Sequence, residues 1–177
     1  MQKLKNEELD RISIEDYKAS DKTPIIIVLD NIRSMNNIGS AFRTADAFLV
    51  EKIILTGITA QPPHREINKT ALGATDSVPW QYFEESSEAI DYLHQENYQV
   101  LAIEQAHDSI MLHQFLPQKE TKYALVFGNE VKGVSNEVMQ RVDNCLEIPQ
   151  KGSKHSLNIS VSIGIVLWDL GQKMKIF

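Results

Sequence analysis

The 177-residue sequence has little cysteine, few aromatic residues and no long uninterrupted apolar run. Cys145 is the only cysteine, so an internal disulfide and a site with several cysteine ligands are excluded. We expect Cys145 to fill space in a buried strand. The longest apolar segment, residues 157–170, is interrupted by serine, glycine and aspartate and is too short to span a bilayer. No charged-then-apolar leader opens the chain, so we expect a cytoplasmic protein without membrane contact.

Basic residues are also scarce, since 18 Lys and Arg face 24 Asp and Glu for a net charge of -6. This balance by itself disfavours a nucleic-acid partner, because phosphate binding usually leaves a basic footprint. Every charged residue from 70 to 118, apart from the histidines, is acidic. We expect an acidic face on one side and a mildly basic surface on the other, although an ordinary solvated helix explains the acidic block equally well. The five histidines show no tight ligand spacing, so we expect no metal site.

Five short runs rich in Ile, Val and Leu recur along the chain, beginning at Pro24, Glu51, Tyr98, Lys122 and Asn144. They are continuous rather than alternating, which indicates strands that are buried on both faces. Helical patterns lie between them: residues 37–48, a segment capped by Ser86 or Ser87, and one capped by Ser135 that carries Val138 and Val142. The sequence therefore predicts one α/β domain over residues 1–177, with a mostly parallel sheet covered by helices on both faces.

Ligands of such sheets bind where loops leave the carboxyl ends of the strands. Three loops are candidates: "EQAHDS" after Ile103, "GNEVKGVS" after Phe127 and "PQKGSKHS" after Ile148. If the three strands are parallel neighbours, their loops converge on one crevice. We expect the ligand site there.

The segment "VFGNEVKGVS", residues 126–135, combines two glycines with a carboxylate. Gly128 directly after a buried strand lets a ligand approach the backbone, and Gly133 permits a turn before the next helix. Glu130 then lies at the mouth of the strand. A plain loop with a surface glutamate is an equally good interpretation of this segment alone.

The segment "IPQKGSKHSLNIS" opens with a strand end and leads into a helix. Pro149 ends strand pairing, and Gly152 lies in a loop that is able to fold over an adenine or a phosphate. Ser156 and Asn158 sit at the helix start, where backbone N–H groups are free for a ligand. The helix is apolar on nearly every side, so we expect it to be buried, with the small residues at 156, 160 and 164 packing either in the core or against a second subunit.

The segment "LDNIRSMNNIGSAFRTADAF", residues 29–48, places an arginine in an apolar helix. We expect Arg43 to be partly buried and to need an anion, with Asn37 assisting by hydrogen bonding. A purely structural pair between Arg43 and Glu130 is the alternative.

Three segments together resemble, in order and spacing, the motifs of the SpoU (TrmH-like) RNA 2'-O-ribose methyltransferases of the SPOUT superfamily: the first motif "NNIGSAFRTADAF" (residues 36–48), the second "VFGNEVKGVS" (126–135) and the third "IPQKGSKHSLNISVSIGIVLWDL" (148–170). The resemblance covers nearly the whole chain. It implies a C-terminal trefoil knot, a homodimer through the C-terminal helix and the first-motif region, and transfer of a methyl group from S-adenosylmethionine to RNA. The opening "KLKNEELDRIS" is similar to a short N-terminal helix of a family subgroup, so we expect residues 1–22 to be a helical extension.

The resemblance also implies roles for single residues. Gly128, Ile148 and Leu157 match positions whose backbone holds the cofactor, with Ile103 or Glu104 a weaker match and Gly152 in the neighbouring loop. The polar positions of the catalytic site are matched by Arg43, Asn37, Glu130, Ser156 and Asn158. The basic residues that flank the motifs, which we expect to lie in loops, are candidates for RNA binding: Arg33, Arg65, Lys69, Lys132, Lys151 and Lys154.

The substrate remains open at this point. Low positive charge and the absence of a separate RNA-binding domain depart from many relatives, and we expect a compact RNA, transfer RNA before ribosomal RNA. The alternatives are a base methyltransferase of the same knotted superfamily and a binding module without catalysis. A nicotinamide-dependent oxidoreductase ranks lower, because no GxGxxG follows the first strand.

Overall fold

The computed structural model describes residues 1, 3–5, 8–9 and 11–176. Within this part of the chain, seven strands form one sheet in the order β3-β2-β1-β6-β4-β7-β5, and every pairing is parallel. The strands are β1 (Thr23–Asp30), β2 (Val50–Thr56), β3 (Trp80–Phe83), β4 (Tyr98–Ile103), β5 (Ile110–Met111), β6 (Lys122–Phe127) and β7 (Asn144–Glu147). The predicted parallel sheet is confirmed.

The central strands are apolar at consecutive positions because helices cover both faces of the sheet. In β1, Ile25 and Ile27 belong to one hydrophobic cluster, while Ile26 and Val28 belong to the other. All five predicted strands are present. Two further strands, β3 and β5, were not predicted, since β3 is a half-exposed edge strand of mixed residues and β5 has only two residues.

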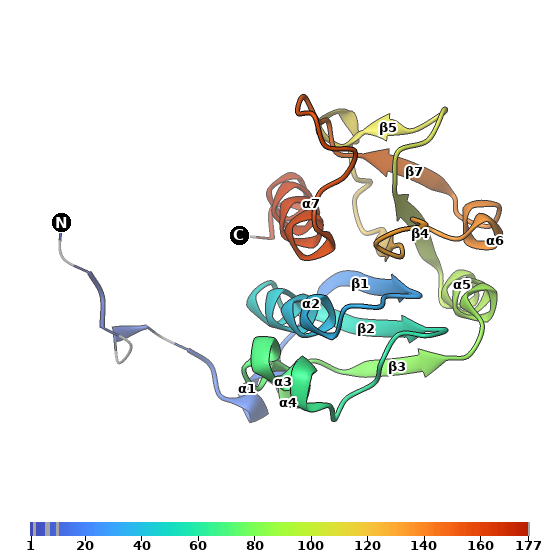
Figure 1. The fold of residues 1–177 in the computed structure, drawn as a ribbon. Helices are drawn as coiled ribbons and strands as arrows, with labels where there is room; N and C mark the ends of the chain where they lie inside the picture. The colour runs from blue at the N-terminus through green and yellow to red at the C-terminus, as the bar shows by residue number, and fades with distance from the viewer. Residues whose placement is uncertain (2, 6–7, 10, 177) are drawn as a thin grey trace.

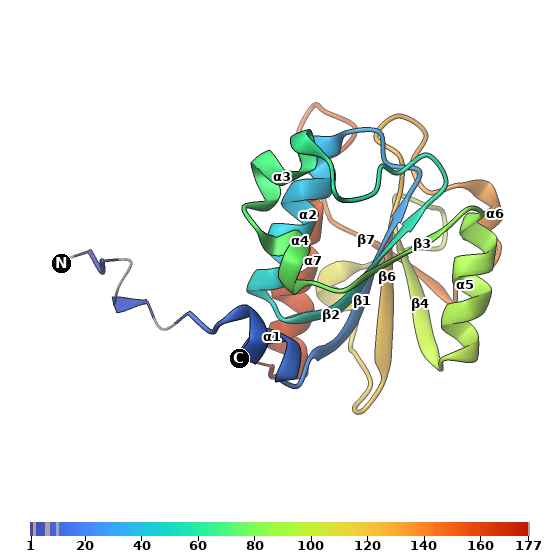
Figure 2. The same cartoon turned by 90° about the horizontal axis from the view of Figure 1, so that it is seen from below.

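The helices form two layers, as Figure 2 shows: α1 to α4 and α7 lie on one face of the sheet, and α5 and α6 lie on the other. Their bounds are α1 (Ile14–Ala19), α2 (Met35–Ala47), α3 (Arg65–Ala71), α4 (Ala74–Ser77), α5 (Ser86–Gln95), the 3-10 turn η2 (Leu112–Gln114), α6 (Asn136–Met139) and α7 (Ile159–Met174). The expected α/β architecture with helices on both faces is therefore correct.

The predicted helix starts were only partly right. The helix of the first motif begins two residues earlier than expected, because Ser34 Oγ accepts a hydrogen bond from Asn37 N at 3.3 Å. Neither Ser86 nor Ser87 caps α5; Glu85 holds the cap position, and the Ser86 hydroxyl donates to Asp30 Oδ1 instead. Ser135 is the cap residue of α6 but makes no side-chain cap hydrogen bond. Val142 lies beyond the end of α6.

Among the described residues of the expected N-terminal extension, one α-helix is present. Residues 14–19 form α1, whose Tyr17 is buried against the core. The described residues before α1 lie away from the body of the molecule (Figures 1 and 2). Several positions of the predicted helix, residues 6–7 and 10, lie outside the described residues.

The two strands in the last third of the chain insert between earlier strands of the sheet. Strand β6 lies between β1 and β4, and β7 lies between β4 and β5, so that each enters between strands that precede it in the sequence. The chain then continues into α7, which packs on one face of the sheet and contacts both α2 and η2 (Figure 1). No local sequence pattern reveals this strand order.

Helix α7 is not buried on all sides, contrary to the expectation from its composition. One side, which includes Ile163 and Val166, is fully buried in the core. The other side leaves Val161 at 49% exposure, Ile165 at 37% and Trp168 at 57%. An apolar helix therefore presents a second apolar face that the described residues of this chain do not cover. In the part of the chain that the structure describes, no helix is long and apolar enough to cross a membrane.

Cys145 lies half-buried in β7. Its thiol donates to the backbone oxygen of Glu104 at 3.4 Å, and burial raises the pKa of that thiol. The predicted role as a filler within a strand agrees with this position.

Candidate active site

The three candidate loops meet at one edge of the sheet. Strand β4 pairs in parallel with both β6 and β7, so their carboxyl ends lie side by side. A cavity of about 770 Å³ opens between the loops. The predicted cofactor positions Gly128, Ile148 and Leu157 all line it, and so do Ile103 and Glu104.

The loop of residues 128–135 forms one wall of the cavity and is tightly folded. Asn129 and Gly133 exchange two backbone hydrogen bonds of 3.0 and 2.8 Å. A Cβ atom at Gly128 would lie 2.0 Å from the backbone nitrogen of Val134, which explains why this position needs glycine. Gly133 has a φ of 70°, a conformation that side chains disfavour.

The Glu104 side chain, directly after β4, supports the same loop through hydrogen bonds. Its Oε2 accepts a hydrogen bond from Val134 N at 3.0 Å, and its Oε1 accepts one from Gln105 N at 2.9 Å. A Cβ atom at Gly133 would lie 2.2 Å from Glu104 Oε2, so the glycine makes room for the carboxylate. Glu104 therefore lines the cavity while both its oxygens are engaged with backbone amides.

Glu130 reaches from the second motif to the first. Its Oε2 accepts a hydrogen bond from Arg33 N, and its Oε1 accepts bonds from Ser34 N and from the side-chain amide of Asn37, each at 3.0 Å. The carboxylate thus binds two backbone amides just before α2 and the side chain of Asn37 in its first turn. It is not paired with Arg43, which was the structural alternative considered from the sequence.

The charge of Glu130 is favoured by these contacts. Burial by itself would raise the pKa of the carboxyl, but the hydrogen bonds from the backbone of Arg33, the side chain of Asn37 and the backbone of Ser34 hold the pKa below its ordinary value. The group is therefore an anion throughout the neutral range, and it acts as an acceptor only.

Asn158 connects the third motif to the same network. It caps α7, with Oδ1 accepting from Ser160 N at 2.9 Å and from Ser160 Oγ at 2.6 Å. Its Nδ2 donates to Asn37 Oδ1 at 3.2 Å. Asn37 therefore links Asn158 to Glu130, and the three motifs meet through these side chains. Ser156 lines the cavity nearby.

Arg43 is exposed, and the expectation that it is partly buried is wrong. The buried stripe of α2 consists of Ile38, Gly39, Ala41, Phe42 and Ala45. Residue 43 falls off this stripe, on the solvent side of the helix. It is not among the residues that line the cavity, so its guanidinium is available to a ligand that arrives from outside.

The predicted basic residues are spread around the cavity rather than gathered in it. Lys132 lines the cavity itself, while Arg33, Lys151 and Lys154 are exposed in loops as expected. Gly152 lies in the same exposed loop, does not line the cavity, and has no atom within 4 Å of the position a Cβ would take.

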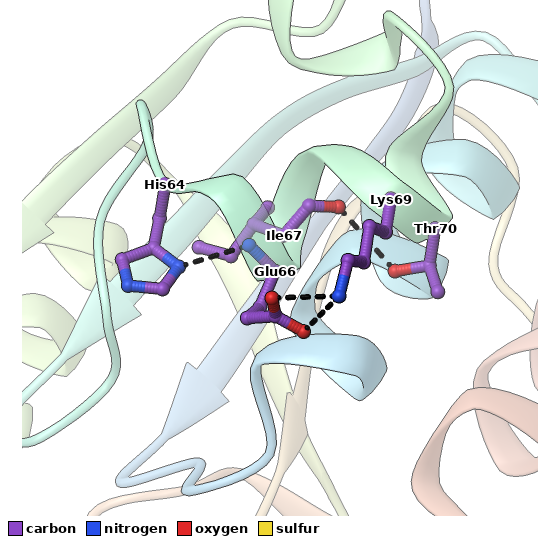
Figure 3. A network of polar contacts seen from close by, with 5 residues as sticks. All are labelled: His64, Glu66, Ile67, Lys69 and Thr70. Carbon is purple, nitrogen blue, oxygen red and sulfur yellow. Dashed lines mark hydrogen bonds and ion pairs between the residues drawn. The ribbon is translucent and has the colours of Figure 1, made fainter.

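Arg65 and Lys69 lie on helix α3 and not in a loop, which corrects the expectation from the sequence. Figure 3 shows His64 Nδ1 accepting from Glu66 N at the start of this helix, and Lys69 paired with Glu66 at 2.7 Å. The helix is fixed to α2, because Thr70 Oγ1 donates to the backbone oxygen of Asn36 at 2.9 Å.

Several residues of the cavity were not predicted from the sequence. Gln105 Nε2 donates to the backbone oxygen of His155 at 2.5 Å and so joins the first candidate loop to the third. The loop "EQAHDS" was identified, but nothing in its pattern distinguishes Gln105 from its neighbours. The other unpredicted lining residues include Asn136, Met139 and Gln150.

A family model and individual relatives both connect this chain with RNA methyltransferases. A family model described as the SpoU rRNA Methylase family matches residues 24–168. The 23S rRNA (guanosine-2'-O-)-methyltransferase RlmB of Vibrio parahaemolyticus is 30% identical over 164 residues, which cover 92% of this chain and 64% of that protein. RlmB of Escherichia coli K12 is also 30% identical, over 157 residues that cover 88% of this chain and 63% of the relative. The chain thus spans less than two thirds of the length of these relatives.

Solved structures of the same family superpose on the chain. An AdoMet-bound rRNA methyltransferase from Sinorhizobium meliloti aligns with a TM-score of 0.79 and 28% identity, over 86% of this chain and 57% of that one. The TrmH/SpoU tRNA modifying enzyme of A. aeolicus aligns with a TM-score of 0.79 and 23% identity, over 92% and 81%. Because the family model covers residues 24–168, which is most of the chain, the chain belongs to the SpoU rRNA methylase family, and it has the knotted α/β fold of the SPOUT superfamily.

Proposed function

We propose that the protein methylates a ribose 2'-hydroxyl of an RNA with S-adenosylmethionine as the methyl donor. The observation that carries this proposal is that Gly128, Ile148 and Leu157 line one cavity whose rim holds the hydrogen-bonded side chains of Glu130, Asn37 and Asn158. The names of the relatives point to the same reaction. An intact polar network argues against a binding module without catalysis.

The cavity suits the proposed cofactor in size and in chemistry. Its volume of about 770 Å³ lies within the range of small-molecule sites. The wall of residues 128–134 offers backbone groups, while Ile103, Ile148 and Leu157 offer apolar surface. When bound, S-adenosylmethionine supplies a methyl group that is already activated by its sulfonium. The protein therefore has to align the ribose and provide a path for its proton.

Glu130, Asn37 and Asn158 serve as a rigid frame for alignment. The Asn37 side chain donates to Glu130 and accepts from Asn158, so both ends of its amide are fixed. Such a frame keeps its geometry when the substrate arrives, which lowers the cost of positioning. Ser156, exposed at the cavity, is the group in this set that is available to a ribose hydroxyl.

Arg43 binds the phosphate next to the target ribose in this proposal. A guanidinium stays protonated in proteins and presents donors only, so it clamps and polarises rather than removes a proton. The proton of the 2'-hydroxyl then passes to the phosphate or to water. The exposure of Arg43 on α2 leaves it accessible to RNA.

The RNA contacts are assigned to the exposed cations around the cavity: Arg33, Arg65, Lys69, Lys132, Lys151 and Lys154. Arg65 and Lys69 lie one turn apart on α3, which is held against the helix of Arg43. Transfer RNA was the first expectation from the sequence, whereas the RlmB relatives are named for 23S ribosomal RNA. Both remain candidates for this chain.

We further propose that the uncovered face of α7 pairs with a second copy of the chain. A shallow groove of about 600 Å³ runs along this face and includes Ser160, Val161, Gly164 and Ile165. No atom lies within 4 Å of a Cβ built at Gly164, so the helix surface is smooth there. Of the two roles considered for the small residues, packing against a second subunit is favoured. Helix α2, which carries the first motif, packs against α7, and we assign the first-motif region to the same interface.

The decisive experiment is methyl transfer from labelled S-adenosylmethionine into total RNA of a strain that lacks the protein. Nucleoside mapping then identifies the RNA and the modified position. A 2'-O-methylated nucleoside is expected. A methylated base would support the base methyltransferase instead, and transfer that occurs equally without the protein would refute the proposal.

A further inference from the structure

Asp30 is a buried carboxylate that the proposed reaction leaves without a role. It is the last residue of β1, and its side chain has 0% exposure. In the described part of the chain, no lysine, arginine or histidine forms a salt bridge with it. Burial of a carboxylate without a cation costs free energy of folding unless hydrogen bonds compensate for the lost hydration. The hydrogen bonds of Asp30 are therefore essential to its place in the fold.

Three donors from three different elements converge on this carboxylate. Oδ1 accepts from Ser86 Oγ at 2.7 Å, at the start of α5, and from Asn31 Nδ2 at 2.8 Å. Oδ2 accepts from the backbone N–H of Ser135 at 2.8 Å, at the end of the loop of residues 128–135. Only a group that accepts with both of its oxygens satisfies this arrangement.

Asn31, the residue after Asp30, holds the start of the loop of residues 128–135. Asn129 Nδ2 donates to the backbone oxygen of Asn31 at 2.7 Å. Asn129 Oδ1 in turn accepts from the backbone N–H groups of Val131 and Lys132, at 2.9 and 3.1 Å. Asp30 and Asn31 therefore fix both ends of the wall that carries Gly128 and Glu130.

We propose that Asp30 is a positioning residue for this wall, and that its carboxylate sets the affinity of the cavity for S-adenosylmethionine without touching the ligand. The inference rests on the proposed function. The hydrogen bonds within the loop and from Glu104 fix its internal shape, whereas the bonds to Asp30 and Asn31 fix where its two ends sit relative to β1. An error of about 1 Å in such a wall is enough to weaken binding and slow the reaction.

The first test is Asp30→Asn, which keeps the size of the side chain but turns one acceptor into a donor. At the Oδ2 position the new NH₂ group faces the Ser135 N–H and breaks that anchor directly. At the Oδ1 position it faces Asn31 Nδ2 and disturbs Asn31, the residue whose backbone oxygen holds Asn129. We expect S-adenosylmethionine to bind about tenfold more weakly by titration calorimetry, since one lost buried hydrogen bond is worth about that factor. Backbone amides of residues 129–135 should also exchange hydrogen faster, which is a measurement that needs no ligand.

A matched control lies at the other end of the same strand. Thr23 is 7% exposed, and its Oγ1 donates to the backbone oxygen of Phe48 at 2.7 Å. Thr23→Val removes that buried hydrogen bond but should leave both the binding constant and the exchange of residues 129–135 unchanged. A loss of affinity in Thr23→Val equal to that in Asp30→Asn would show general destabilisation and overturn the inference.

A second variant keeps Asp30 and removes its partner. Ser135 has a φ of -62°, which proline adopts, so Ser135→Pro keeps the backbone angle while it removes the amide donor and places the ring Cδ against Asp30 Oδ2, which breaks this anchor from the side of the loop. It should reproduce the weaker binding and the faster exchange. Unchanged exchange and affinity in both variants would overturn the inference. Wild-type protein that does not bind S-adenosylmethionine would instead refute the proposed function, and the exchange data alone would then support or reject Asp30 as the anchor of the loop.

Discussion

The side-chain amide of Asn37 donates a hydrogen bond of 3.0 Å to the carboxylate of Glu130, although 93 residues separate the two in the sequence. The contact joins the start of α2 to the wall of the cavity. It also orients Asn37 so that its oxygen accepts from Asn158 at the cap of α7. Glu130, Asn37 and Asn158 therefore fix one another's positions, so a substitution at one of them should shift the other two.

Arg43→Ala should abolish methyl transfer while largely sparing cofactor binding. The guanidinium is exposed and lies outside the cavity lining, so its loss removes a contact to RNA and not to S-adenosylmethionine. We expect the turnover number to fall about 10²- to 10³-fold, as for removal of one charge-stabilising donor. Single-turnover assays and calorimetry on the same preparation measure the two effects. Turnover within a few-fold of wild type would refute the role given to Arg43.

Gly128→Ala should weaken S-adenosylmethionine binding through the backbone. The added methyl group would lie 2.0 Å from Val134 N and 2.1 Å from the carbonyl carbon of Gly133, so the loop must move. Overpacking of this kind costs about 1–3 kcal/mol. Gly152→Ala is the matched control, because a Cβ there meets no atom within 4 Å, and its binding constant should not change. Weakened binding in Gly152→Ala would mean that this loop closes over the cofactor, as the sequence first suggested.

The anchoring by Glu130 should persist in mild acid and fail only at low pH. Because the folded state lowers the pKa of Glu130, its stabilising effect is present above the pKa of the unfolded chain and is lost as the pH falls through the folded pKa. S-adenosylmethionine affinity should therefore show an acid-dependent loss below the ordinary pKa range of glutamate. Glu130→Gln should flatten that part of the profile. A wild-type profile that loses affinity near neutrality would contradict this assignment.

Ile165→Asp should convert a dimer to a monomer. The side chain lies on the uncovered apolar face of α7, where a buried carboxylate without a partner is costly. Sedimentation velocity measures the change directly. Leu116→Asp is the control, since Leu116 is 79% exposed and is not among the residues of the groove. Wild-type protein that sediments as a monomer at micromolar concentration would refute the proposed pairing.

Arg65→Ala and Lys69→Ala should weaken RNA binding in a salt-dependent way. Each residue that contacts a phosphate contributes about 0.7 to 0.9 to the slope of log affinity against log salt. Lys69 also forms an ion pair with Glu66, so Arg65 should have the larger effect. Filter binding at several salt concentrations measures both slopes. An unchanged slope in Arg65→Ala would remove α3 from the RNA interface.

The sequence by itself determined five of the seven strands and the chemistry of the loops that follow three of them. Strands such as β1, β4 and β6 were predictable because burial on both faces demands continuous apolar residues, as in Ile25 to Leu29. The convergence of three loops on one cavity followed from a simple rule about the carboxyl ends of parallel neighbours, whereas the resemblance to the family singled out Gly128, Ile148 and Leu157 within them. Local signals of this kind lie within a few residues of one another, so a single sequence records them.

Only the tertiary structure decided which polar groups meet and which faces stay open. The exposure of Arg43, the uncovered side of α7 and the convergence of Ser86, Asn31 and Ser135 on Asp30 all depend on how distant elements pack. The insertion of β6 and β7 between earlier strands is a property of the overall topology. Hydrogen bonds between residues 93 or 105 positions apart leave no periodic pattern in the sequence. Such a contact depends on how the intervening elements pack and not on the local spacing of residue types.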